Sequence, residues 1–222
     1  MDYRSETRAA YRDERRAAAY ENHQTRRLSW ARFATCRELR GVKKALRCYV
    51  WSDRDIALDV PCGTGILGAT LSQFPFRVVA ADISMEMMGR ASGEYREHTR
   101  LGFVQADITD LPLGRGRFAC VIALGLLHRL PQEIRERALH ELSRLAARVV
   151  IVSYSVDGIW QRGKRAGLRI VAPGYKPPPN SIRLEAIRQE ITAAGFTVVR
   201  WFRTVPALSA DVVFVLEKRN GM

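Results

Sequence analysis

Cysteine is scarce in this 222-residue sequence, and its four copies, Cys36, Cys48, Cys62 and Cys120, form no C-x-x-C pair and no metal-ligand spacing. This pattern argues against a disulfide framework and against a metal site, so we expect reduced thiols and no metal. Long apolar runs are missing as well, because the longest, 118–127, is too short to cross a bilayer. The first six residues are polar and do not resemble a secretory signal. We therefore expect a cytoplasmic protein without a membrane span.

Acidic residues are in short supply: 23 Asp and Glu stand against 36 Lys and Arg, which gives a net charge of +13. The imbalance lies in two flanks, because residues 1–55 hold 14 basic and 8 acidic groups and residues 144–222 hold 13 and 5. Such flanks fit an anionic substrate or a nucleic acid, and they fit a solvated basic surface equally well. No basic stripe interleaved with aromatic residues is present, so a nucleic-acid partner is not favoured. The oligomeric state is left open.

The sequence does contain a regular alternation of short β-like runs with helical patterns. The β-like runs lie at about 56–60, 77–81, 102–106, 118–124, 148–154, 197–204 and 211–217. This alternation predicts an α/β fold with a doubly wound, mostly parallel seven-stranded sheet and helices on both faces. The segment 206–210 is too short for a crossover helix, so the last two strands are expected to form an antiparallel hairpin.

The most informative segment is 57–68, where an apolar run ends in Asp59 and a glycine-rich turn leads into helix-like sequence. Glycine lets the backbone approach a ligand and adopt positive φ, and the following helix offers free N–H groups at its start. Gly63, Gly65 and Gly68 also fit the G-x-G-x-x-G fingerprint of dinucleotide-binding folds, with Asp82 at the expected distance. Either interpretation predicts an adenosine-containing cofactor near residue 63.

Three acidic residues separate these two interpretations, because each follows one of the first three predicted strands: Asp59, Asp82 and Asp107. Three such matches in order are more specific than one glycine turn. The expected antiparallel hairpin at 197–217 also argues against the NAD-binding alternative, whose sixth strand is parallel. The sequence therefore favours a nucleoside cofactor that is not a dinucleotide.

Four blocks in this order resemble the class I, Rossmann-like S-adenosylmethionine-dependent methyltransferases. The blocks are LDVPCGTG (58–65), AADIS (80–84), QADI (105–108) and FACVIALGLLH (118–128). The resemblance covers residues 55–155 well and the C-terminal strands loosely. One departure is Pro61, which stands where the family usually has glycine. The resemblance implies S-adenosyl-L-methionine as cofactor and a transferase activity.

The resemblance also implies a role for each acidic residue. Asp59 is expected near the methionine ammonium, Asp82 on both ribose hydroxyls and Asp107 on the adenine amino group. Apolar side chains are expected to wall the adenine ring. The residues expected to bind the cofactor are Asp59, Cys62, Gly63, Gly65, Asp82, Ile83, Met87, Asp107, Ile108 and Leu124.

Catalytic residues are harder to predict, because the cofactor supplies an electrophilic methyl carbon and the protein chiefly positions the acceptor. His128 follows the fourth strand and has an ordinary pKa near working pH, so it is our first candidate for a general base; capping of the loop before Pro131 explains it equally well. Tyr154, at the end of the fifth strand, and Tyr20, in the N-terminal helices, are candidates for positioning the acceptor. Wall or core positions explain both tyrosines too.

We divide the chain into an N-terminal helical cap over substrate and cofactor (1–50) and a Rossmann-like domain (51–222). Residues 155–180 are rich in glycine, proline and basic side chains, and we interpret them as a lid-like insertion, since loops of this length often cover a site. A helix is expected at 184–194, capped by Asn180 or Ser181 and ended by Gly195.

The function that these observations favour is methyl transfer from S-adenosylmethionine to an oxygen or nitrogen of a small-molecule metabolite, with an anionic metabolite fitting the basic flanks. One alternative keeps the cofactor but uses it for cyclisation or alkyl transfer. Another is an RNA or protein methyltransferase that uses the basic flanks. An NAD-dependent oxidoreductase is less favoured.

Overall fold

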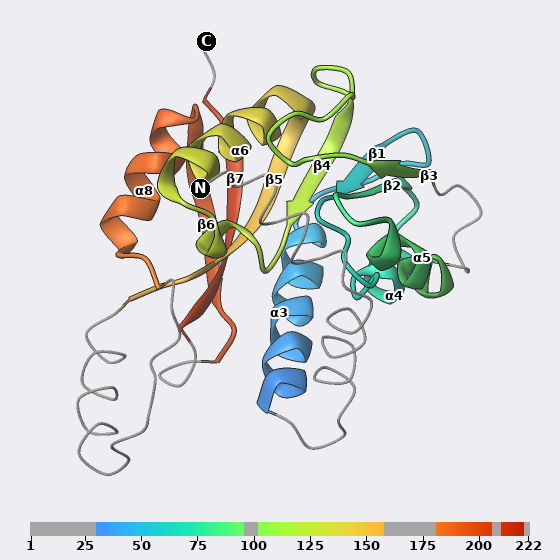
Figure 1. Cartoon of the computed structure of the whole chain (residues 1–222), viewed down its shortest axis with the longest axis horizontal. Helices are drawn as coiled ribbons and strands as arrows, with labels where there is room; N and C mark the ends of the chain where they lie inside the picture. Colours follow the sequence, from blue (N-terminus) through green and yellow to red (C-terminus); the bar gives the residue numbers. More distant parts are fainter. Residues whose placement is uncertain (1–29, 96–101, 158–180, 206–209, 220–222) are drawn as a thin grey trace.

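The computed structural model describes residues 30–95, 102–157, 181–205 and 210–219. Within them, seven strands form one sheet in the order β3-β2-β1-β4-β5-β7-β6 (Figure 1). Strands β1 to β5 pair in parallel, and β7 is antiparallel to both β5 and β6. The predicted fold class is confirmed. The strands are β1 Ile56–Asp59, β2 Arg77–Asp82, β3 Gly102–Gln105, β4 Phe118–Ala123, β5 Ala146–Ser155, β6 Phe196–Arg203 and β7 Asp211–Lys218.

Helices cover both faces of this sheet, as Figure 1 shows. On one face α3 (Trp30–Leu46) packs on β7 and β6, and α4 (Gly68–Leu71) and α5 (Met85–Glu94) pack near β2. On the other face lie α6 (Gln132–Leu145) and α8 (Leu184–Ala193). A short 3₁₀ helix, η1 (Leu127–Arg129), leads from β4 to α6.

Two apolar clusters, one on each face, follow from the alternation of side chains along each strand. In β5, Val150, Val152 and Tyr154 belong to the cluster with α6 and α8, whereas Val149 and Ile151 belong to the cluster with α3 and α5. Ser153 continues the second set and therefore faces the α3 side. All of these side chains are buried.

The strand order reverses between β1 and β4, and this reversal determines where a ligand can bind. Connections leave these two strands toward opposite faces, so a crevice opens beyond their carboxyl ends. Asp59 ends β1 and Asp82 ends β2, and Asp59 is in register with Ala80 of β2. The predicted cofactor residues thus share one edge of the sheet.

Some local predictions need correction or lie outside the described residues. Helix α8 begins after Arg183 without a side-chain cap, so Ser181 does not cap it, while Gly195 ends it with a φ of +83°. The insertion predicted from residue 155 starts later, because Ser155 belongs to β5 and Val156 forms a β-bridge with Ile182. Residues 1–29 and 158–180, which include most of the expected cap and lid, lie outside the described residues. Among those described, no helix has the length and apolar character needed to span a membrane.

Candidate active site

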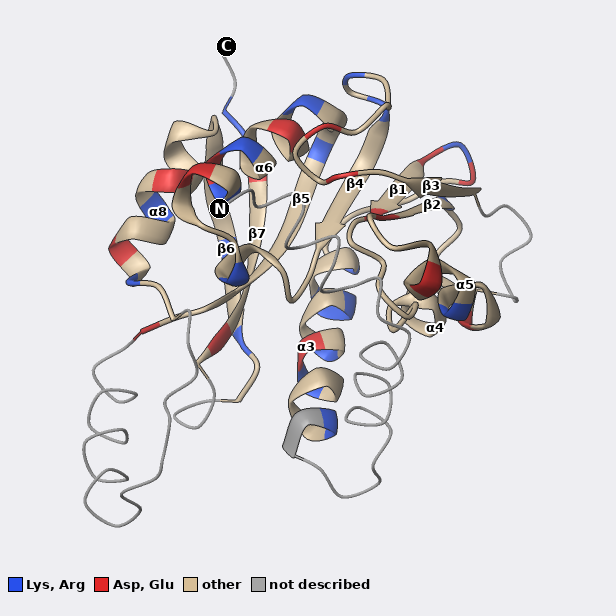
Figure 2. Ribbon diagram, viewed as in Figure 1, with Lys and Arg blue, Asp and Glu red and all other residues tan. Residues whose placement is uncertain are grey.

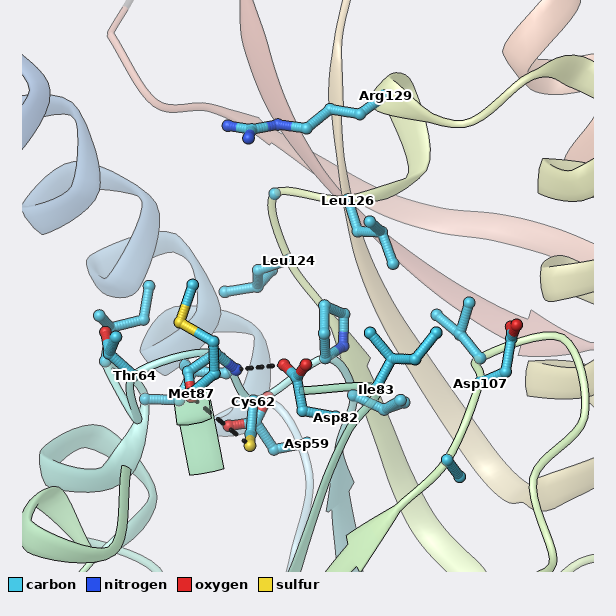
Figure 3. A pocket seen from close by; sticks show the side chains of 18 residues that line it. Asp59, Cys62, Thr64, Asp82, Ile83, Met87, Asp107, Leu124, Leu126 and Arg129 are labelled. Atoms are coloured by element: carbon cyan, nitrogen blue, oxygen red, sulfur yellow. Dashed lines mark hydrogen bonds between the residues drawn. The ribbon is translucent and has the colours of Figure 1, made fainter. Parts of the chain in front are cut away.

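A pocket opens at the carboxyl ends of β1, β2 and β4, where the strand order reverses (Figure 3). Its walls come from the loop after β1, the ends of β2 and β3, and the loop after β4. Of the ten residues expected to bind the cofactor, nine line this pocket and Gly65 does not. The lining residues are Asp59, Val60, Pro61, Cys62, Gly63, Thr64, Ile66, Leu67, Asp82, Ile83, Met87, Ala106, Asp107, Ile108, Leu124, Gly125, Leu126 and Arg129.

Asp82 stands in the middle of the pocket, and its carboxylate points into the space (Figure 3). Its Oδ2 accepts the Gly63 N–H at 2.8 Å and its Oδ1 accepts the Ser84 N–H at 2.9 Å. A carboxylate has about four acceptor positions, so these two bonds fix its orientation and leave acceptor capacity toward the pocket. Burial raises the pKa of Asp82, and the backbone hydrogen bonds oppose this shift.

Asp59 is almost fully buried at the end of β1. The hydroxyl of Tyr95, at the end of α5, donates a hydrogen bond to its Oδ2, and Oδ1 has no hydrogen-bond partner among the described residues. Burial raises the pKa of Asp59 to about 7, the Tyr95 hydrogen bond lowers it and the charge of Asp82 raises it. A buried carboxylate oxygen without a partner is a costly arrangement that a bound cation would relieve.

Asp107 lies at the opposite end of the pocket from Thr64 (Figure 3). Its Oδ1 accepts hydrogen bonds from the N–H and the hydroxyl of Thr109, at 2.9 and 2.8 Å. Ile108, which is 5% exposed, lines the pocket beside it. This end therefore combines a fixed carboxylate with apolar surface, which suits a heteroaromatic ring with a polar edge.

Gly63 and Gly65 in this loop meet two different structural requirements for glycine. A Cβ at Gly63 (φ +53°) would meet nothing within 4 Å, so this residue leaves open space on the pocket side. A Cβ at Gly65 (φ +82°) would lie 2.9 Å from the Glu94 side chain and 3.0 Å from the Ala91 backbone. Gly65 therefore allows α5 to pack close to the loop, and its contact with the cofactor stays a prediction.

Cys62 lines the pocket as a small, buried residue. Burial and the neighbouring carboxylates of Asp59 and Asp82 raise the pKa of its thiol. The thiolate, which is the nucleophilic form, is thus disfavoured here, and Cys62 acts as a wall.

The remaining lining residues, Gly125, Leu126 and Arg129, come from the loop after β4 and from η1. The guanidinium of Arg129 reaches across the opening of the pocket toward α3 (Figure 3). It is solvent-exposed, so it is the cation that an incoming anionic molecule would meet. No sequence pattern predicted a role for Arg129, although it directly follows His128, the candidate general base.

The two catalytic candidates that the structure describes, His128 and Tyr154, do not line the pocket. His128 is partly buried beside Arg129 and does not line the pocket, and its Nδ1 has no hydrogen-bond partner within the described part of the chain. Burial, with the nearby Arg129, lowers the pKa of His128 to about 4. Tyr154 is fully buried against Phe214 on the α6 and α8 side, so it cannot position an acceptor there. Tyr20 lies outside the described residues.

Two residues that the sequence analysis missed lie beside this opening. Glu38 of α3 forms a hydrogen bond with the hydroxyl of Ser153, and Ser153 Oγ accepts the Gly125 N–H at 2.8 Å. One signal for Glu38 was available, because it is the only acidic residue of α3 and lies four and seven residues before the apolar Val42 and Ala45. A lone acid on an apolar helix stripe indicates a buried charge with a partner.

Comparisons with known proteins agree with this geometry. Residues 57–148 match a family model described as a methyltransferase domain. The chain is 34% identical over 164 residues to the demethylmenaquinone methyltransferase of Clavibacter sepedonicus, which covers 69% of this chain and 66% of that protein. It is 30% identical over 110 residues to the chloroplastic magnesium protoporphyrin IX methyltransferase of Arabidopsis thaliana, which covers 46% of this chain and 35% of that protein.

A solved structure shares the whole fold. The magnesium protoporphyrin IX methyltransferase of Synechocystis PCC 6803, crystallised with bound SAH (S-adenosylhomocysteine), has a TM-score of 0.76 and 18% identity and covers 98% of this chain and 100% of that chain. The chain therefore has the fold of a methyltransferase and contains a segment that matches a methyltransferase domain, and it spans less than two thirds of the length of the two curated relatives. The same Synechocystis enzyme has also been crystallised with bound SAM (S-adenosylmethionine), and that structure has a TM-score of 0.74 and 17% identity to this chain.

The chemistry of the pocket fits S-adenosylmethionine. The partnerless Oδ1 of Asp59 suits a cationic ammonium, the acceptor capacity of Asp82 suits a sugar diol, and the open space beside Gly63 admits a ligand against the backbone. Apolar side chains such as Ile83 and Met87 complete the walls. Among the described residues, no group of three or more His, Cys, Asp or Glu side chains is placed to hold a metal ion.

Proposed function

We propose that this protein transfers the methyl group of S-adenosylmethionine to an oxygen or nitrogen atom of a small anionic molecule. The observation that carries the proposal is the pocket itself, where the carboxylates of Asp59, Asp82 and Asp107 lie along one edge and Arg129 crosses the opening. The two curated relatives support a small molecule, because their names specify a demethylmenaquinone and a magnesium porphyrin.

In this proposal Asp59 holds the ammonium of the cofactor, Asp82 its ribose hydroxyls and Asp107 its adenine amino group. Ile83, Met87, Ile108 and Leu124 enclose the adenine, and Cys62 and Gly63 lie against the ligand. The bound cofactor supplies an electrophilic methyl carbon. The chain then has to hold the acceptor in line with that carbon, a contribution that in general reaches effective molarities of about 10⁵ to 10⁸ M.

Arg129 is the residue that we propose for the anionic part of the acceptor. A guanidinium binds a carboxylate or another oxyanion in a two-pronged arrangement, so it both attracts and orients the molecule. Figure 2 shows that several Lys and Arg residues also lie along α3. These cations would favour the approach of an anion. A cytoplasmic location and a cap function for residues 1–50 stay predictions from the sequence.

Isothermal titration tests the cofactor part of the proposal. SAH and S-adenosylmethionine are expected to bind, and NAD is expected not to bind at the same concentration. Tight binding of NAD without a response to either sulfur nucleoside would overturn the proposal. A second assay measures SAH release with candidate acceptors, and the mass of the product must increase by one methyl group. Release of methylthioadenosine in place of SAH would instead favour the alternative in which another carbon of the cofactor reacts.

The nucleic-acid alternative has its own test. If the basic flanks neutralise several phosphates, retention on RNA will fall steeply as salt concentration rises. A response that does not depend on salt would remove this alternative and leave the small-molecule proposal.

A further inference from the structure

Glu38 lies where few glutamates are found, on the stripe of α3 that faces the sheet. Val42 and Ala45, which follow it by four and seven residues, are fully buried on the same stripe. The exposed residues of α3 include Arg32, Arg40 and Lys44, whereas its other basic residues, Arg37 and Lys43, are half-buried. Glu38 is therefore directed toward the carboxyl edge of β5 and the start of β7, and its side chain is partly exposed.

Glu38 is connected to the pocket through a single side chain. Its carboxylate bonds the hydroxyl of Ser153, and that same hydroxyl oxygen accepts the N–H of Gly125, which lines the pocket. A serine hydroxyl donates once and accepts through its lone pairs, so Ser153 fills both roles when Glu38 is the acceptor of its proton. The carboxylate thus lies next to Ser153, whose hydroxyl also holds the backbone of Gly125 in the pocket wall.

The charged groups that face Glu38 come from two other elements. Arg129 of η1 favours its charged form, and Asp211 of β7 opposes it. Arg129 itself points across the opening of the pocket toward α3 (Figure 3). An anion bound by Arg129 would therefore lie between the cofactor pocket and Glu38.

Glu38 is also better matched to proton transfer near neutral pH than His128. Burial raises the pKa of Glu38 to about 7, while the Ser153 hydrogen bond lowers it. Burial lowers the pKa of His128 to about 4, so its imidazole is a weak base. A general base is most effective when its pKa lies near the working pH.

We propose that Glu38 accepts the proton of the methyl acceptor, and that the acceptor atom is accordingly a hydroxyl or amino group of an anionic molecule and not its carboxylate. This inference rests on the proposed function. In the step, the acceptor oxygen or nitrogen forms a bond to the methyl carbon and the carbon–sulfur bond breaks, leaving its electron pair on sulfur. The acceptor's O–H or N–H proton passes to the Glu38 carboxylate. A carboxylate acceptor carries no proton at this pH and would need no such residue.

The experiment compares matched triplets of anionic compounds, each with a hydroxy acid, an amino acid and the parent acid that lacks both groups. The triplets run from single-ring aromatic acids, such as 4-hydroxybenzoate, 4-aminobenzoate and benzoate, to quinone and porphyrin carboxylic acids. SAH release is measured for the wild-type chain, Glu38→Gln and Glu133→Gln, a matched change at an exposed glutamate in the first turn of α6. We expect release with hydroxy or amino members and none with the parent acids.

The best member of the panel is then used for pH profiles. The wild-type kcat should rise with pH through about 7, the value to which burial brings the pKa of Glu38. Glu38→Gln should remove this rise and lower kcat by about 100- to 10,000-fold, with KM changed by less than about threefold. Ser153→Ala keeps the carboxylate and removes a bond that lowers its pKa, so the rise should move to higher pH. Glu133→Gln should behave as wild type.

A carbon-13 NMR titration of the Glu38 carboxyl group in the SAH complex gives a readout independent of turnover, and it should show a midpoint near 7. Thermal melting and SAH affinity of each variant establish that it is folded. The inference is wrong if only parent acids are methylated, if Glu38→Gln keeps the rise of kcat with pH, or if the carboxyl titrates near 4. SAH binding without methylation of any member would overturn the proposed function, and this inference with it.

Discussion

The two sides of the pocket are built in different ways. On the cofactor side, short contiguous segments end adjacent strands, and backbone N–H groups hold the key carboxylate of Asp82 from both directions. On the side that we propose for the acceptor, the residues are single side chains from distant elements: Glu38 from α3, Arg129 from η1 and Ser153 from β5. The first side depends on backbone geometry. The second depends on the identity of a few side chains, so it can change its specificity without disturbing the fold.

The largest effect that tests this comparison is expected at Asp82. Asp82→Ala should weaken SAH binding by at least about 100-fold, because hydrogen bonds to charged groups contribute roughly 1.5–3 kcal/mol each and the carboxylate is expected to receive two from the ribose. The Gly63 and Ser84 N–H groups would also lose their acceptor. Isothermal titration measures the affinity, with Glu133→Ala as the control. An affinity within threefold of wild type would refute the assigned role.

The next effect separates packing from ligand contact within the cofactor side. Gly65→Ala combines a positive φ with a Cβ only 2.9 Å from Glu94, whereas Gly63→Ala has a positive φ and open space. We expect Gly65→Ala to lower the free energy of unfolding by about 2–4 kcal/mol and Gly63→Ala by about 1 kcal/mol. Urea denaturation without ligand measures both. Equal losses in the free energy of unfolding would mean that the close contact with α5 does not determine which residue fits at position 65.

A smaller change on the acceptor side should leave the cofactor untouched. Arg129→Ala is expected to raise KM for an anionic acceptor by about tenfold, since a charge-assisted pair at an exposed position is partly screened. The dissociation constant of SAH should stay within about twofold of wild type. Steady-state kinetics give KM for the acceptor, and isothermal titration of the same preparation gives the dissociation constant of SAH. If SAH binding weakens in parallel with KM, Arg129 contacts the cofactor and the division between the two sides fails.

The smallest expected effect is a pH dependence of cofactor binding. Since burial raises the pKa of Asp59 to about 7, its carboxyl is protonated below this pH in the free protein, and the ammonium of the ligand favours the charged form. SAH affinity should therefore rise with pH up to about 7, by at most about tenfold per unit. Tyr95→Phe removes a hydrogen bond that lowers this pKa, so the rise should move to higher pH. Asp59→Asn should remove the rise of SAH affinity with pH.

The raised pKa of Asp59 also makes the free energy of unfolding depend on pH, and the direction of that dependence follows from the direction of the pKa shift. The pKa of Asp59 is 3.8 in an unfolded chain and about 7 in the fold, so the folded protein holds more protons between these values. The free energy of unfolding without ligand should then fall as pH rises from about 4 to 7. Asp59→Asn should remove part of this fall. Urea denaturation at several pH values measures the free energy of unfolding. If this free energy changes equally with pH in the wild type and in Asp59→Asn, the raised pKa is not that of Asp59.

The cofactor side could be predicted from sequence because its determinants are local. Asp59, Asp82 and Asp107 each follow an apolar run, and parallel strands bring such ends together whatever the rest of the chain does. Gly65 shows the limit of this reasoning, because a glycine pattern cannot tell a contact with ligand from a contact with α5.

The acceptor side could not be predicted in this way. Tyr154 and Ser153 are neighbours in β5, but side chains alternate across a strand. Which of the two faces the α3 side is decided by the packing of α3 on one face of the sheet and of α6 and α8 on the other. His128 and Arg129 are likewise adjacent, and only Arg129 lines the pocket. Glu38 lies 115 residues before Ser153 in the sequence, so no short sequence pattern could predict their contact.

The position of β7 inside the sheet bears on how this protein is made. Strand β6 precedes β7 in the chain, but its pairing partner in the sheet is β7, which also pairs with β5. During synthesis β6 therefore emerges before any strand exists for it to join, while β1 to β5 can already pair with one another. All residues that line the pocket precede β6 in the chain, so the pocket can form before α3 has β7 to pack on.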